Sequence, residues 1–179
     1  MSYSIKAISV DSEKVMKLWN SKNESHLQEL ITAFETKIKD LNKWFKAENI
    51  DASLIVRDMV YGEISFPKLN YVYGYVYEWI CEKYGRNIED HIQTADSLGI
   101  SLEYLSEIDH SASAFIPIPV DSISDFPHII SIAHKNLEKK KSDFLNVELD
   151  YGNEEYQHDF TKIFDYVMKS GTDLVLLNY

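Results

Sequence analysis

Hydrophobic residues in this chain recur mostly at spacings of three and four, the pattern of helices that bury one face. The longest such stretch covers about residues 24–46 and is expected to form one helix, with Ser21 or Asn23 as its N-cap. Its apolar positions are Leu27, Leu30, Ile31, Phe34, Ile38, Leu41, Trp44 and Phe45.

Shorter helical patterns precede and follow this stretch. Asp11 is a plausible N-cap for a helix that carries Val15, Leu18 and Trp19 on one face. A helix after Asp51 is expected to end at Gly62, because glycine is favoured just past helix ends. Its predicted inward residues are Leu54, Ile55, Met59 and Val60.

The second half of the chain predicts more helices and two strands. Helical spacing recurs over residues 92–98, 102–108 and 153–169, and through the lysines at 139–141. Short apolar runs at residues 129–132 and 174–177 resemble the opening run, residues 5–10, and all three predict strands. Prolines between residues 117 and 127 predict an extended connection. The expected fold class is α+β: a mostly helical single domain, residues 1–179, with about three short strands.

An aromatic helix is predicted from Tyr71 to Tyr84, ended by a left-handed Gly85. Its tyrosines could stack on a ligand or partner, or they could belong to the core. Helical spacing gives it two apolar faces, which favours a core helix packed on both sides. Gly74 would let a neighbouring backbone approach closely.

Charge is distributed unevenly along the chain. Residues 1–86 hold twelve acids and twelve bases, and residues 135–179 hold nine acids and six bases. Between them, residues 87–134 carry eight acids and no Lys or Arg, which accounts for most of the net charge of −11. These acids are Glu89, Asp90, Asp96, Glu103, Glu107, Asp109, Asp121 and Asp125. Glu103 and Glu107 lie four residues apart, on one face of the predicted helix, where like charges repel.

This charge excludes some classes of partner and favours others. A strongly acidic surface repels nucleic acid and anionic membranes. With only two arginines, Arg57 and Arg86, the chain also disfavours anionic ligands. Such a surface attracts a cation, either a basic protein or a metal. No apolar run is long enough for a membrane helix, and the first ten residues do not form a signal peptide. With the single Cys81, this predicts a cytoplasmic protein without disulfides.

Motifs that carry chemistry are missing. The six histidines form no zinc-ligand spacing, although His91, His110 and Asp109 could still meet in three dimensions. No nucleophile elbow, phosphate-binding loop or dinucleotide fingerprint occurs. Cys81, beside Glu82, is expected to be a buried spectator. The sequence therefore predicts no catalytic residue, no metal site and no cofactor, and favours a protein that is not an enzyme.

Three groups of residues resemble a family of small, uncharacterised bacterial proteins. They are the opening Met1-Ser2-Tyr3 with Val10-Asp11 and Ser21–Glu24; Gly62-Glu63 with Tyr73-Gly74-Tyr75 through Glu78 and Cys81; and Pro117-Ile118-Pro119 with Asp125-Phe126-Pro127. Members of this family look like cytoplasmic single-domain proteins without an established activity. The resemblance implies no site residue.

The main functional hypothesis is an interaction protein that binds a basic macromolecule through the eight acids of residues 89–125. Its most concrete form is a bacterial immunity protein that neutralises a basic toxin. The alternative is an enzyme or small-ligand-binding domain with a pocket near the aromatic helix, residues 71–84, into which His91, His110 or His128 would converge. A third hypothesis, a subunit of a larger assembly, predicts an exposed apolar patch.

Overall fold

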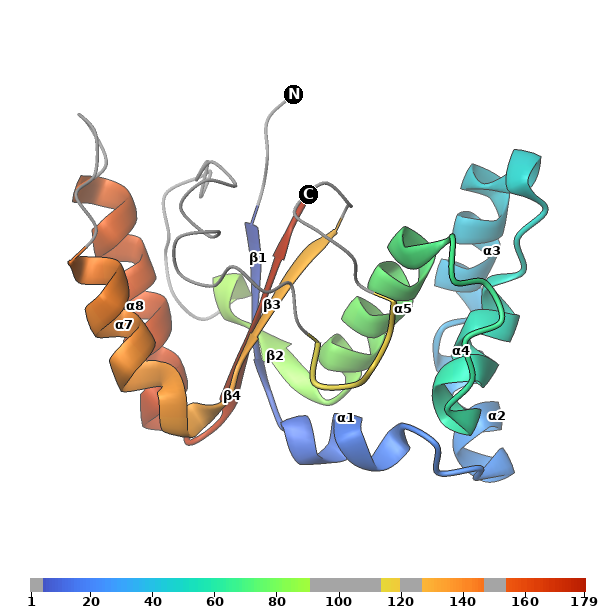
Figure 1. The fold of residues 1–179 in the computed structure, drawn as a ribbon, viewed down its shortest axis with the longest axis horizontal. Coiled ribbons are helices and arrows are strands. Elements are labelled where there is room, and N and C mark those ends of the chain that lie inside the picture. The colour runs from blue at the N-terminus through green and yellow to red at the C-terminus, as the bar shows by residue number, and fades with distance from the viewer. Residues whose placement is uncertain (1–4, 91–113, 120–126, 147–153) are drawn as a thin grey trace.

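Among the residues that the structure describes, the core of the fold is a four-stranded antiparallel sheet in the order β2-β1-β4-β3. The computed structural model describes residues 5–90, 114–119, 127–146 and 154–179. The strands are β1 (Ile5–Val10), β2 (Gly85–Asn87), β3 (His128–Ile132) and β4 (Asp173–Asn178). Strands β1 and β4 pair along their full length, so the first and last strands lie side by side at the centre (Figure 1).

Helices cover both faces of this sheet (Figure 1). On one side lie α1 (Ser12–Leu18), α2 (Glu24–Ala33), α3 (Glu35–Trp44), α4 (Ala52–Tyr61) and α5 (Asn70–Lys83). On the other side lie α7 (Leu137–Leu145) and α8 (Glu154–Ser170). Short 3₁₀ turns occupy Lys46–Glu48, Ile88–Asp90 and His134–Asn136.

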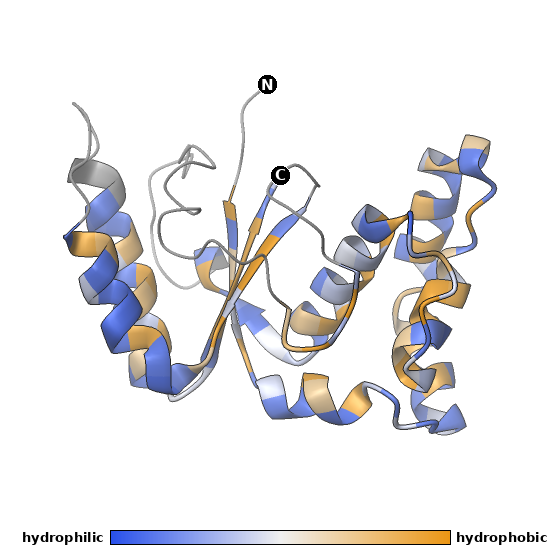
Figure 2. Ribbon diagram, in the orientation of Figure 1, coloured by the Kyte–Doolittle hydropathy of each residue, from blue (hydrophilic) through white to orange (hydrophobic). Residues whose placement is uncertain are grey.

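Alternate residues of the central strands enter two separate hydrophobic cores. Ile8 and Val10 of β1 pack into the core of α1 to α5, whereas Ile5 and Ala7 pack into the core of α7 and α8. Because successive strand side chains point to opposite faces, a strand buried on both sides needs apolar residues at nearly every position. Figure 2 shows this as strands that are hydrophobic along most of their length.

The α+β class and the three predicted strands are confirmed, but the sheet has a fourth strand, β2, that the sequence analysis missed. The aromatic helix ends just before Gly85, as predicted, but the left-handed conformation expected of Gly85 was wrong. It begins β2, and a Cβ there would lie 2.5 Å from the Ser9 carbonyl oxygen and 2.7 Å from that of Cys81. Glycine is needed here for close backbone approach rather than for a positive φ.

The predicted helix ends are largely confirmed. Asn23 and Asp51 cap α2 and α4 by accepting hydrogen bonds from backbone N–H groups of the first turn. Gly62 ends α4 with φ of 68°, the left-handed conformation expected of it. Leu54, predicted to face inward, is instead 41% exposed, because the buried stripe of α4 runs through Ala52, Ile55 and Met59.

The single helix predicted over residues 24–46 is two helices, α2 and α3, which meet at Phe34. Phe34 leaves helical geometry (φ −103°, ψ 10°) while its ring is buried and lies 5.7 Å from that of Trp79. Trp44 was counted among the apolar positions of the helix, yet it is 69% exposed. Phe45 instead packs against Tyr71, with ring centroids 5.0 Å apart.

The aromatic helix α5 is a core helix, as predicted. Tyr73, Val76, Tyr77 and Ile80 are completely buried. Gly74 allows a close approach, but of a proline ring rather than of the backbone that was expected. A Cβ at this position would lie 2.8 Å from Cδ of Pro127. The proline ring thereby fixes how closely the start of β3 approaches α5.

No helix in the described part of the chain is long and apolar enough to span a membrane.

Replacing Gly74 by alanine tests the contact between Gly74 and Pro127. The test is whether the substitution stabilises or destabilises the folded protein. In a helix interior, Gly→Ala normally stabilises by about 1 kcal/mol. Here the added methyl group meets the Pro127 ring, so Gly74→Ala is expected to destabilise by about 1–3 kcal/mol. The measurement is urea-induced unfolding followed by circular dichroism. In a Pro127→Ala background the same change should become neutral or stabilising, and a stabilising effect in the wild-type background would contradict the packing.

Candidate functional site

A cavity of about 330 Å³ opens at the end of the sheet where β1 leads into α1 and α8 leads into β4. We call it the hydroxyl pocket. Its lining residues are Ser9, Asp11, Lys14, Tyr84, Gly85, Arg86, Tyr166, Ser170 and Thr172. Ser9 and Arg86 are cross-strand partners in the pairing of β1 with β2, so their side chains share one face of the sheet. The pairing of two strands therefore places a hydroxyl group and a guanidinium group in the same cavity.

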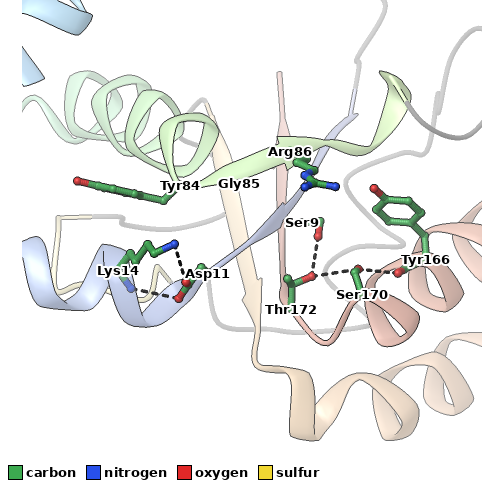
Figure 3. A pocket seen from close by; sticks show the side chains of 9 residues that line it. All are labelled: Ser9, Asp11, Lys14, Tyr84, Gly85, Arg86, Tyr166, Ser170 and Thr172. Atoms are coloured by element: carbon green, nitrogen blue, oxygen red, sulfur yellow. Dashed lines mark hydrogen bonds and ion pairs between the residues drawn. The ribbon is translucent and has the colours of Figure 1, made fainter.

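Three hydroxyl groups form a chain along one wall of the hydroxyl pocket (Figure 3). The Oγ of Ser9 lies 2.6 Å from Oγ1 of Thr172, which lies 3.3 Å from Oγ of Ser170. Ser170 donates its own proton to the Tyr166 carbonyl oxygen, 2.7 Å away. Because each hydroxyl has one proton, Ser170 accepts from Thr172 and Thr172 accepts from Ser9. Ser9, which lines the cavity, thus keeps the capacity to accept a further hydrogen bond.

The positive charges of the hydroxyl pocket differ in their surroundings. The Lys14 ammonium lies 3.1 Å from an oxygen of Asp11, and this contact lowers the pKa of Asp11. Arg86 is exposed and forms no ion pair with any described residue. Figure 3 shows Arg86 above Ser9, with Tyr166 to the right of both. The other arginine, Arg57, pairs with Glu63 at 3.2 Å. A guanidinium without a carboxylate partner can hold an anionic group of a ligand through its planar fork.

A second cavity, of about 310 Å³, lies between α3, α5 and the end of β4. We call it the acid–aromatic pocket. It is lined by Lys37, Asp40, Trp44, Glu78, Trp79 and Tyr179. Trp79 is buried and Trp44 is exposed. The Lys37 ammonium lies 5.9 Å from the centroid of the Trp79 ring, within the range of a cation–π contact.

Carboxylates and ammonium groups alternate in the wall of the acid–aromatic pocket and next to it. Glu78 accepts from Lys6 at 2.6 Å through one oxygen and from the Tyr179 hydroxyl through the other. Glu82 accepts from both Lys6 and Lys37. Burial raises the pKa of Glu78, and the neighbouring Lys6 only partly offsets it. Burial also acts on Glu82, but two ammonium groups outweigh it and lower the pKa of this carboxyl.

The acids predicted to bind a partner lie mostly outside the described residues. Glu89 is exposed in the turn Ile88–Asp90 that follows β2, and Asp90 ends the same turn. The other predicted partner-binding acids, Asp96, Glu103, Glu107, Asp109, Asp121 and Asp125, lie outside the described ranges, as do His91 and His110. The clustering of these acids on one surface therefore stays a prediction.

Comparison with known proteins gives one match. The model of a family described as a domain of unknown function, DUF7691, matches residues 1–173. The chain belongs to the DUF7691 family. The resemblance to an uncharacterised family is thereby confirmed. No curated protein and no solved structure matches. Since membership assigns no activity, the function of this DUF7691 protein has to be argued from its own side chains.

In this DUF7691 protein, almost nothing in the sequence indicated that the residues of the two pockets would form sites. Ser9 and Thr172 are 163 positions apart, and Glu78 and Tyr179 are 101 apart. The pairing of β1 with β4 brings the first two together, and the packing of α5 against the sheet brings the second two together. The one local signal is on α3, where Lys37, Asp40 and Trp44 follow the three-and-four spacing of one helix face. Periodicity placed Trp44 in the core instead, since helical spacing cannot show which face is covered.

Buried Asp58 and Cys81 lie outside both pockets, and neither forms a candidate site. Asp58 accepts from the backbone and hydroxyl of Ser65, at 2.9 and 2.8 Å, and from the Tyr73 hydroxyl, which fixes the loop after α4. Cys81 is fully buried, as expected, and burial raises its pKa, so the thiolate is disfavoured. Within the described ranges, no three His, Cys, Asp or Glu side chains are grouped so that they could hold a metal ion.

His128 and Asn178 are cross-strand partners at one end of the β3–β4 pair, and both side chains are buried. Neither side chain forms a hydrogen bond with a described residue. Burial lowers the pKa of His128 below its ordinary value of 6.5, so the folded protein keeps this imidazole neutral at pH values where the unfolded chain protonates it.

This difference predicts a pH dependence of stability. As the pH falls below 6.5, the unfolded chain takes up a proton at His128 before the folded protein does, so folding weakens. The slope contributed by this site is at most about 1.4 kcal/mol per pH unit, and it vanishes below the folded-state pKa. His128→Leu should remove this contribution, while His158→Gln, at an exposed helix position, should retain it. The free energy of unfolding measured from pH 8 to pH 5 tests this, and equal slopes for wild type and His128→Leu would contradict it.

Proposed function

We propose that this protein binds a basic protein partner through the eight acids of residues 89–125. The observation that carries the proposal is the absence of any Lys or Arg from residues 87–134, among eight acids. Ordinary surfaces intersperse both signs of charge, and a segment of one sign attracts a partner of the opposite sign over several ångströms of water. A basic partner gains association rate and orientation from such a field.

The ion pairs elsewhere in the molecule support the proposal. In the described part of the chain, at least nine of the 18 Lys and Arg residues pair with acids outside residues 87–134. Lys83 with Glu29 and Lys141 with Asp165 are examples, at 2.8 and 2.6 Å. Bases already engaged by other carboxylates are less available to neutralise the acidic segment. In its more specific form, the partner is a toxin and this protein is its immunity protein.

Charge reversal within the acidic segment tests the proposal. A fluorescent nona-arginine peptide serves as a defined basic probe, with fluorescence anisotropy as the measurement. Glu103→Lys, Glu107→Lys and Asp109→Lys together should weaken binding at least tenfold at 20 mM salt, or about 1.4 kcal/mol. Binding by the unmodified chain should also weaken steeply between 20 and 200 mM salt, because salt screens exposed charges.

The matched control separates position from total charge. Glu48→Lys, Glu138→Lys and Asp143→Lys change the net charge from −11 to −5, as the first triple variant does, but at exposed positions outside residues 87–134. Their effect on peptide affinity should be clearly smaller. If the two triple variants lose affinity equally, general net charge governs binding and the proposed binding segment is wrong.

A second candidate function is binding of a small ligand in the hydroxyl pocket, which borders the end of the aromatic helix at Tyr84. The observation that favours it is Arg86, exposed in a cavity lined by hydroxyl groups and without a described carboxylate partner. Although the overall charge disfavours anions, this is a local positive site. The ligand class is a small molecule that carries one anionic group for Arg86 and a hydrogen-bond donor for Ser9.

Titration with inorganic phosphate tests this second candidate by nuclear magnetic resonance. The backbone amides of Arg86 and Thr172 should shift in a saturable manner, and Arg86→Gln should weaken binding at least tenfold. Arg57→Gln is the matched control, because it removes the other arginine, which pairs with Glu63. Linear shifts without saturation, or equal effects of both substitutions, would count against a binding site in the hydroxyl pocket.

A further inference from the structure

Trp44 is the most exposed of the large apolar side chains that the structure describes, at 69% of its surface. Leaving an indole in water forgoes roughly 2 kcal/mol of hydrophobic stabilisation. Trp44 lines a cavity rather than a convex surface, and it shares one face of α3 with Lys37 and Asp40. A ring placed this way offers an uncovered face to whatever enters the acid–aromatic pocket.

The charges around the acid–aromatic pocket do not balance. There are three carboxylates in or next to the pocket, those of Asp40, Glu78 and Glu82. There are only two ammonium groups, those of Lys6 and Lys37. Glu78 and Glu82 take up both ammonium groups. Asp40 is exposed and pairs with no Lys or Arg in the described ranges. The cavity is therefore left with about one negative charge, next to the free face of an indole.

The same cavity already holds one cation against one aromatic ring. Lys37 lies over Trp79 while its ammonium pairs with Glu82. Trp44 and Asp40 offer the same two elements, an aromatic face and a carboxylate, without a cation from the described chain. The cavity of about 310 Å³ is at the lower end of the size range of ligand pockets, which suits a single side chain.

We propose that the acid–aromatic pocket receives an arginine side chain of the basic partner, with the guanidinium stacked on Trp44 and paired with Asp40. The inference rests on the proposed function for the identity of the partner. Arginine is favoured over lysine because its planar guanidinium can stack on an indole and form two parallel hydrogen bonds to a carboxylate at once. Trp44 is then an anchor residue of the interface, a role that tryptophan often fills.

The test uses Nα-acetyl-argininamide as the probe and the indole N–H resonance of Trp44 as the reporter, in ¹⁵N-labelled full-length protein. The resonance should shift in a saturable manner, while that of Trp19, which lies outside the pocket, should not. Nα-acetyl-lysinamide should bind several-fold more weakly, and the neutral Nα-acetyl-glutaminamide should produce no saturable shift. Equal shifts with all three probes would overturn the inference.

Two variants complete the test. Asp40→Asn should weaken argininamide binding roughly five- to tenfold, because the carboxylate is lost while the indole stays. Glu35→Gln on the same helix, whose carboxylate pairs with Lys39 at 2.6 Å, should leave the affinity unchanged. Undiminished binding by Asp40→Asn would overturn the proposed contact.

The outcome is separable from that for the acidic segment. If argininamide fails to shift Trp44 while reversal of Glu103, Glu107 and Asp109 still abolishes peptide binding, the pocket inference falls and the proposed function stands. If argininamide binds at Trp44 and those reversals have no effect, the pocket stands and the segment of residues 89–125 is not the binding face.

Discussion

The antiparallel pairing of β1 with β4 is the interaction on which the rest of this structure depends. It joins the two ends of the chain, from Ile5 opposite Asn178 to Val10 opposite Asp173. Both strands are covered on both faces, so their residues enter two cores at once. Removing this pairing would expose both cores. Because both faces of the two strands are covered, four of the six residues in each strand are apolar.

Two polar residues of β1 connect this strand with the two pockets. Ser9, near one end of β1, reaches the hydroxyl pocket together with Thr172, just before β4. Lys6, near the other end, reaches the carboxylates beneath the acid–aromatic pocket, which Tyr179 lines just after β4. Polar side chains on a central strand need partners, and Ser9 and Lys6 of β1 find theirs near the strand ends, next to the two cavities. The same pairing that builds the core thus builds both candidate sites.

Local features of the fold could be predicted from the sequence, because they follow from local chemistry. Asp11, Asn23 and Gly62 cap helices in the predicted way, and the aromatic helix is buried as its two apolar faces indicate. Strand β2 could not be predicted, since three residues show no alternation and Gly85 resembles a helix end until Ser9 is known to lie against it. The exposure of Trp44 could not be predicted either, because periodicity does not reveal where the covering elements stop. Both pockets depend on contacts between elements far apart in the sequence, and local patterns do not encode such contacts.

Zero-length crosslinking measures directly whether the acids of residues 89–125 contact the basic partner. A carbodiimide joins a carboxylate only to an amine in contact with it, so it records which acids touch lysines of a bound basic protein. With a partner purified by low-salt capture, we expect crosslinks concentrated on the acids between Glu89 and Asp125, and their loss at high salt. Crosslinks confined to acids outside this range, such as Glu13, Glu48 or Glu138, would contradict this expectation.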